Sequence, residues 1–166
     1  MILALALAAT PLAVSAQSAA GTVDASATIL AYLNVQNVAD LDFGNIAAGS
    51  GATLTPGLVP ASGTLGVLQI DHNSEVNVSV SAPAALTLGL NSVPVTFDCG
   101  YSLAPSGVLV SAAQSCSAMS NRTATVNGTT QTTYIQVGGD ILAANTLNKA
   151  PGTYIGSLVF TVTAIY

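Results

Sequence analysis

The chain has 166 residues, of which 51% are hydrophobic and 5% are charged, and its formal net charge is −5. Only two basic residues, Arg122 and Lys149, are present, so the basic surface that binds nucleic acid is excluded. The hydrophobic content also excludes a disordered chain, and a surface of Ser, Thr, Asn and Gly has little charge repulsion to oppose packing against other proteins.

The first sixteen residues, Met1–Ala16, are almost entirely apolar, and this run is shorter than the about 20 residues of a membrane-spanning helix. It ends in the small residues that a signal peptidase prefers, although no Lys or Arg precedes it. Two interpretations stay open, a secretory signal whose basic region lies upstream, or a buried hydrophobic segment. We predict a signal peptide at 1–16, cleaved after Ala16 or Ala20, and one exported domain at 17–166 without a further membrane span.

The first strand is predicted from the alternation in Thr22–Ile29, which places one apolar set on a single face. This set is Val23, Ala25, Ala27 and Ile29. The apolar run continues to Val35, so we expect one long strand that can contain a bulge.

Short strands separated by Gly, Pro and Asn turns are predicted through the middle of the chain. Their ranges are Asp40–Ile46, Ala52–Leu54, Thr64–Ile70, Glu75–Ser81, Ala85–Leu90, Val93–Cys99, Val108–Ala113, Ala124–Val126, Thr129–Val137 and Ile141–Ala144. The turns that matter most are expected at Asn91-Ser92, Asn127-Gly128 and Gly138-Gly139. Because no amphipathic helix is found beyond one turn near Ala143–Leu147, the pattern predicts an all-β antiparallel sandwich.

The last strand is predicted within Gly152–Tyr166, where β-branched and aromatic residues alternate. The residues that share its apolar face are Leu158, Phe160, Val162, Ala164 and Tyr166. This strand and the first one are the two long alternating strands, and we predict that they pair, either within one molecule or between neighbours.

Cys99 and Cys116 are the only cysteines, and in an exported chain they most simply form one disulfide. The loop that this bond closes contributes about 3 kcal/mol in the chain-entropy interpretation. Two cysteines and one distant histidine do not give the spacing of a metal site.

Two groups of residues could carry chemistry, and each has a simpler structural interpretation. His72 follows Asp71 and could form a triad with a serine, yet no Gly-x-Ser-x-Gly sequence marks a nucleophile, so a turn histidine is favoured. Asp40 and Asp42 could bind calcium or act as acid and base, but a turn-capping role is favoured beside Phe43-Gly44. We therefore predict no catalytic residue, no metal, no cofactor and no enzyme activity.

Three short motifs carry a resemblance to known proteins. Leu41-Asp42-Phe43-Gly44, Val137–Leu142 and Gly152-Thr153-Tyr154-Ile155-Gly156 resemble a family of bacterial exported domains of unknown function. More loosely, the chain resembles spore-coat-protein-U-type and chaperone–usher pilus subunits, across nearly all of 17–166. Gly152 stands fourteen residues before Tyr166, as a glycine does in pilins, whereas the tyrosine is terminal and the cysteines lie mid-chain, unlike in pilins.

The pilin resemblance implies an incomplete immunoglobulin-like sandwich that lacks its last strand. Its groove would be filled first by a periplasmic chaperone and then, with an usher, by the N-terminal segment of the next subunit, which is strand addition at an exposed edge. The expected function is a subunit of a surface fibre, pilus or coat that associates with itself or with sibling subunits. The alternative is a self-contained secreted adhesion module whose own first strand completes the sandwich.

Overall fold

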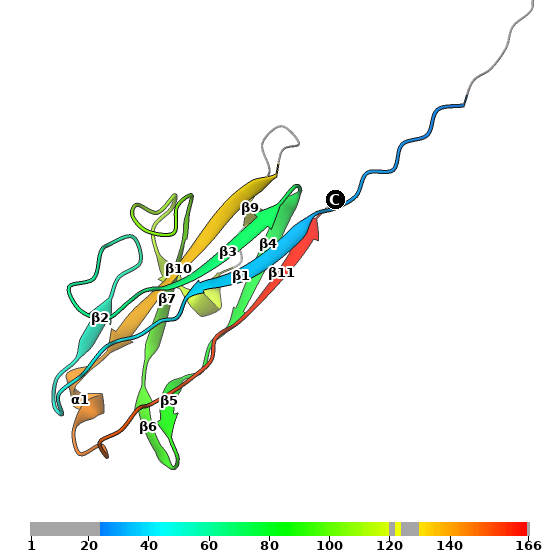
Figure 1. Cartoon of the computed structure of the whole chain (residues 1–166). Coiled ribbons are helices and arrows are strands. Elements are labelled where there is room, and N and C mark those ends of the chain that lie inside the picture. The colour runs from blue at the N-terminus through cyan, green and yellow to red at the C-terminus, as the bar shows by residue number, and fades with distance from the viewer. Residues whose placement is uncertain (1–23, 120–121, 124–129, 166) are drawn as a thin grey trace, which may run out of the picture.

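A computed structural model describes residues 24–119, 122–123 and 130–165, and Figure 1 shows their arrangement. The structure is 48% strand and 5% helix, and its sheets are antiparallel, so the prediction of an all-β sandwich is confirmed. The predicted signal peptide at 1–16 lies outside the described residues.

The larger sheet has six strands. Five follow the order β1-β3-β10-β7-β8, and β2 pairs with the C-terminal end of β10. The strands are β1 (Leu33–Ala39), β2 (Ala52–Leu54), β3 (Gly66–His72), β7 (Thr96–Ser102), β8 (Gln114–Ser115) and β10 (Gln131–Ile141). Because β3 and β10 lie in the middle and alternate in polarity, Ile70 and Ile135 are fully buried on the inner face.

The smaller sheet has the order β11-β4-β9, and a separate hairpin is formed by β5 and β6. These strands are β4 (Glu75–Ser81), β5 (Ala85–Leu88), β6 (Asn91–Pro94), β9 (Arg122–Thr123) and β11 (Val159–Ile165). Two short helical turns, η1 (Cys116–Ala118) and α1 (Ala143–Thr146), complete the described structure, and α1 falls where one turn was predicted. Val78 of β4 is fully buried in the same core cluster as Ile70 and Ile135.

The predicted start of the first strand is wrong. Residues 24–32 form no strand, and β1 begins at Leu33, where the chain pairs with His72 of β3. The alternation is real, but in the described part of the chain its apolar side chains Ala25, Ala27 and Ile29 are exposed, with Ile29 at 94%. Periodicity reports how a segment can pair and does not say with what.

The predicted turn at Gly138-Gly139 is also wrong, because β10 runs straight through both glycines to Ile141. A Cβ atom on Gly138 would lie against the carbonyl oxygen of Leu54, and one on Gly139 would lie against that of Thr96. The glycines therefore permit β2 and β7 to approach β10 closely, and close approach of another backbone is a known reason for glycine inside a strand.

Other boundaries moved for local reasons. The hairpin turn lies at Gly89-Leu90 and not at Asn91-Ser92, since Leu88 pairs with Asn91 and Gly89 supplies a φ of +57°. Val108–Ala113 forms a loop with one bridge from Leu109, and Asp40–Ile46 keeps only the bridge at Asp42.

Two further strand predictions are wrong: Val93–Cys99 is divided between β6 and β7, which lie in different sheets, and Ile141–Ala144 holds only the last residue of β10 and the start of α1. The other strand predictions agree with the structure within a few residues or lie outside the described residues. Ala52–Leu54 and Glu75–Ser81 have the predicted bounds, while β3 ends two residues later than expected. The predicted strand Ala124–Val126 and the turn Asn127-Gly128 lie outside the described residues.

Candidate functional site

β1 and β11 each have a free edge in the described structure. β1 pairs with β3 alone, and β11 pairs with β4 alone, so each is the outermost strand of its sheet. An outermost strand presents a row of unpaired backbone N–H and C=O groups, which is a template for another strand.

An open groove of about 1170 Å³ lies between the β1 side and the chain that leads into β11. Its floor is formed by core residues from the larger sheet and the β5–β6 hairpin, with Val93, Phe97, Val137 and Ile141 all at most 6% exposed. Its walls carry half-buried apolar side chains, namely Leu41, Ile46, Leu68, Leu86, Tyr154, Leu158 and Phe160. Side chains that pack against the core but stay partly exposed mark a place where apolar cover is missing.

The backbone of the groove's C-terminal wall is oriented for pairing. Ile155 donates to and accepts from Thr87 of β5, at 3.0 and 2.8 Å. In an extended chain, neighbouring residues direct their N–H and C=O groups to opposite edges. The backbone groups of Tyr154 and Gly156 are therefore directed away from β5, and both residues line the groove.

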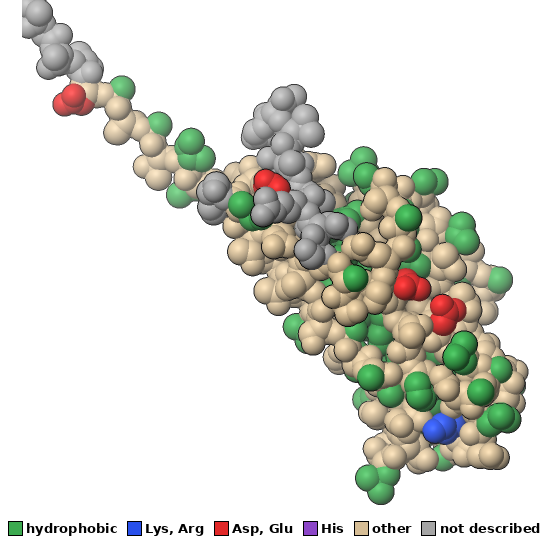
Figure 2. Space-filling model, turned by 180° about the vertical axis from the view of Figure 1, so that it is seen from behind, with side chains coloured by type: hydrophobic (Ala, Val, Ile, Leu, Met, Phe, Trp, Pro, Cys, Tyr) green, Lys and Arg blue, Asp and Glu red, His purple; other side chains and the backbone are tan. Residues whose placement is uncertain are grey.

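A free extended segment, the arm (residues 24–31), leaves the domain at the start of β1. Figures 1 and 2 both show it standing clear of the body. Ala25, Ala27 and Ile29, three residues of the predicted pairing face, are exposed there, and Leu30 is 78% exposed. Val23, the fourth, lies outside the described residues.

The arm and the groove are compatible in length and in character. The six residues 24–29 span about 20 Å at about 3.4 Å per residue, which fits within the extended stretch of groove wall from Thr153 to Phe160. The small apolar side chains of the arm's alternating face suit a groove whose floor is already filled by core residues.

The structure places the predicted C-terminal face as follows. Phe160, Val162 and Ala164 are half-buried on the inner side of β11, and Leu158 precedes the strand. Leu158 and Phe160 line the groove. Tyr166 lies outside the described residues.

Sequence reasoning missed the opposite wall, which is formed after β1 by Leu41, Phe43 and Ile46. The signal was present, because Leu41 and Phe43 alternate with Asp40 and Asp42 in the first of the motifs noted above. The two aspartates are held locally. Asp42 Oδ1 accepts from the Gly44 N–H at 2.8 Å, which is the favoured turn-capping role, and Asp40 Oδ1 accepts from Asn37 Nδ2 at 2.7 Å.

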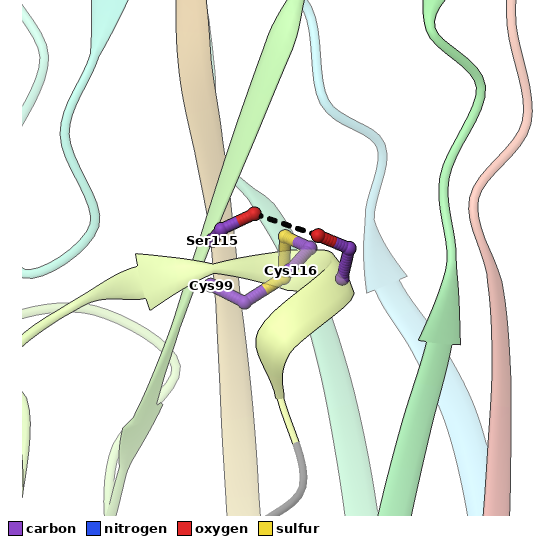
Figure 3. The surroundings of a disulfide bond; sticks show 4 residues. Cys99, Ser115 and Cys116 are labelled. Carbon is purple, nitrogen blue, oxygen red and sulfur yellow. Dashed lines mark hydrogen bonds between the residues drawn. A yellow bond between two sulfur atoms is a disulfide. The ribbon is translucent and has the colours of Figure 1, made fainter.

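The predicted disulfide between Cys99 and Cys116 forms, and both residues are fully buried. Figure 3 shows that it ties β7 to the first residue of η1, beside the hydrogen bond between Ser115 and Ser117. The two cysteines are 17 positions apart, so closing the loop stabilises the domain by about 3 kcal/mol in the chain-entropy account. The bond lies in the core and away from the groove.

His72 is fully buried, and both of its ring nitrogens have partners. Nδ1 lies 2.7 Å from the Ser74 carbonyl oxygen, which can only accept, so Nδ1 donates this hydrogen bond, and Nε2 lies 3.1 Å from the Thr133 hydroxyl. Burial raises the pKa of Tyr101 to about 12, so this phenol stays protonated in the core. Among the described residues, no group of three or more His, Cys, Asp or Glu side chains could hold a metal ion.

Asp71 lies on the other face of β3 from His72 and joins three strands next to the root of the arm. Its carboxylate accepts from Thr132 Oγ1 of β10 at 2.6 Å, from Gln69 Nε2 at 3.0 Å, and from Asn34 Nδ2 of β1 at 3.4 Å. The Thr132 hydroxyl, more than the Gln69 and Asn34 amides, holds the pKa of this carboxyl below its usual value.

A depressed carboxyl pKa makes stability depend on pH in one direction. The folded pKa of Asp71 is below the unfolded one, so its contribution is present above the unfolded pKa of about 3.9 and is lost as pH falls through the folded pKa. We expect Asp71→Asn to lower the free energy of unfolding at pH 7, and the difference from wild type to shrink in urea titrations towards pH 2. Thr132→Val should reproduce part of the loss, and a difference that stays constant with pH would contradict this assignment.

Comparison with known proteins does not identify the chain. No protein-family model matches the chain, and no curated protein or solved structure is significantly similar to it. The resemblance to the exported-domain family therefore stays a prediction. Within the described residues, no helix has the length and hydropathy to cross a membrane, and the buried disulfide is compatible with export.

Proposed function

We propose that this protein is an exported structural subunit of a surface fibre, pilus or coat, and that copies assemble by donor-strand exchange. The arm of one copy enters the groove of the next and adds a strand between β1 and β11. The domain is then an immunoglobulin-like sandwich completed by its neighbour. The observation that carries the proposal is that the same chain has both an exposed alternating arm and an open groove with an apolar floor.

The free arm also separates this function from its main alternative. A self-contained adhesion module would use its own first strand to complete the sandwich, whereas residues 24–31 make no strand with their own domain. Backbone hydrogen bonds would supply affinity for the incoming arm, and apolar side chains at every second position would fill the groove. While the groove awaits an arm, a periplasmic chaperone and an usher fit as transient partners, since an uncovered apolar groove invites aggregation.

A non-catalytic role agrees with the surroundings of the three residues that were considered for catalysis or metal binding. His72 is enclosed in the core, and Asp40 and Asp42 each bond to a neighbouring donor. Strand pairing needs none of these side chains.

The direct test is to delete Gln17–Ala27 and to follow the product by size exclusion and electron microscopy. We expect the deletion to leave a folded monomer and to abolish large assemblies. Val59→Asp is a matched control, because Val59 is 86% exposed and does not line the groove. Unchanged assembly of the deleted protein would rule out donor-strand exchange.

A further inference from the structure

The arm does not leave the domain loosely, because three hydrogen bonds hold its root. Asn73 Oδ1 accepts from the Tyr32 N–H at 2.7 Å, and Asn73 Nδ2 donates to the Leu30 carbonyl at 3.1 Å. The Asn73 N–H donates in turn to the Tyr32 carbonyl at 3.2 Å. One residue thus binds the chain on both sides of Ala31, at the last point before the arm becomes free.

Asn73 itself is anchored from the core. It lies in the short turn between β3 and β4, and the buried ring of His72 donates from Nδ1 to the carbonyl of Ser74 across that turn. His72 also pairs with Leu33, the first residue of β1. The direction in which the arm starts is therefore tied to the rigid centre of the larger sheet.

The connection from the arm to the body is too short to absorb a change of direction. Only Leu30, Ala31 and Tyr32 separate Ile29 from Leu33, a span of at most about 14 Å at about 3.4 Å per residue. If Ile29 is seated in the groove of a neighbour, the two bodies lie close together. Their relative orientation then follows from the direction in which residues 30–32 leave the sheet.

We propose that Asn73 is a positioning residue that fixes the direction of the arm and, through it, the angle between successive copies in the assembly. This inference rests on the proposed donor-strand exchange. Asn73 does not line the groove. It acts on the geometry of the connection and leaves the affinity of the arm for the groove unchanged.

The test is a distance distribution between spin labels on Ser26→Cys in the arm and Ser92→Cys in the exposed β6, measured in protein diluted with unlabelled chains. In the otherwise unchanged protein we expect a narrow distribution. Asn73→Ala, which removes both side-chain hydrogen bonds, should widen it at least twofold. Asn73→Asp keeps the acceptor for Tyr32 and loses the donor to Leu30, so it should give an intermediate width.

Two further readouts separate positioning from a merely structural role. The thermal midpoints of both variants should stay within a few degrees of wild type, and Asn73→Ala assemblies should form but bend with a persistence length at least twofold shorter in electron micrographs. An unchanged distance distribution in Asn73→Ala would show that Asn73 does not fix the direction of the arm. An unchanged persistence length would show that Asn73 does not set the angle between copies in the assembly. Assembly that survives deletion of Gln17–Ala27 refutes donor-strand exchange instead, while the distance measurement still reports on Asn73.

Discussion

Replacing Ile29 by aspartate is expected to abolish assembly while the isolated domain stays as stable as before. Ile29 is 94% exposed in the free chain, so the folded monomer loses no packing, and its free energy of unfolding should change by less than about 0.5 kcal/mol. In the assembled state the same side chain would enter an apolar groove. There the substitution removes about 1.5–3 kcal/mol of burial and adds the cost of an unpaired carboxylate.

The expected loss of affinity is at least about 100-fold, since each 1.4 kcal/mol is a factor of about ten. It can be measured as the protein concentration at which assemblies appear in light scattering. The neighbouring substitution Thr28→Asp adds the same charge on the opposite face of the arm and should shift that concentration by no more than about threefold. Equal effects at both positions would show that charge alone matters, and would contradict entry of one face of the arm into a groove.

The sandwich could be predicted from the sequence because its signals are local. Glu75–Ser81 has one polar and one apolar face, and its bounds follow from that pattern. Cys99 and Cys116 could be paired because no third cysteine competes. The single helical turn near Ala143 was likewise visible in the chain.

The errors arose where the outcome depends on residues distant in the chain. Gly138 and Gly139 carry the usual signal of a turn, but the strands that crowd them, β2 and β7, come from other parts of the sequence. The arm carries the usual signal of a strand, and yet it pairs with no strand among the described residues of its own domain. Neither fact can be derived from local propensity.

The two strand-forming segments of the candidate site could also be predicted from local sequence patterns. The alternating faces at Ala25–Ile29 and Leu158–Ala164 were found as patterns, since each is continuous in sequence. The groove between them could not be predicted, because its floor combines residues from three different strands. These residues are Val93 of β6, Phe97 of β7, and Val137 and Ile141 of β10. A cavity of that kind exists only after the sheets have packed.

The hydrogen bonds of Asp71 and those of Asn73 lie two positions apart in the chain and have separable roles. Asp71 joins Asn34 of β1 to Thr132 of β10 and so stabilises the strand from which the arm departs. Asn73 acts one step further out, on the backbone of Leu30 and Tyr32. The first should be detected in the free energy of unfolding and the second in the geometry of the arm.

A free peptide that copies the arm should stabilise a protein whose own arm has been shortened to residues 28–31. A peptide of residues 22–31, added to the protein that lacks Gln17–Ala27, is expected to occupy the open groove. Because such a peptide binds the folded state alone, a concentration 100 times its dissociation constant adds about 2.7 kcal/mol of stability. For a domain of this size, that corresponds to a rise of about 5–10 °C in the thermal midpoint.

The position of the peptide can be read from hydrogen exchange. Strand addition at the free edge should slow the exchange of backbone N–H groups along the groove wall, at Gly156 and Leu158, and leave those of the distant β8 unchanged. The matched control is the same peptide with aspartate at the positions of Ala27 and Ile29, which should give neither the thermal shift nor the protection. If both peptides stabilise the protein equally, or if protection appears only away from the two walls of the groove, then the groove is not a strand acceptor and the free edges of β1 and β11 need another partner.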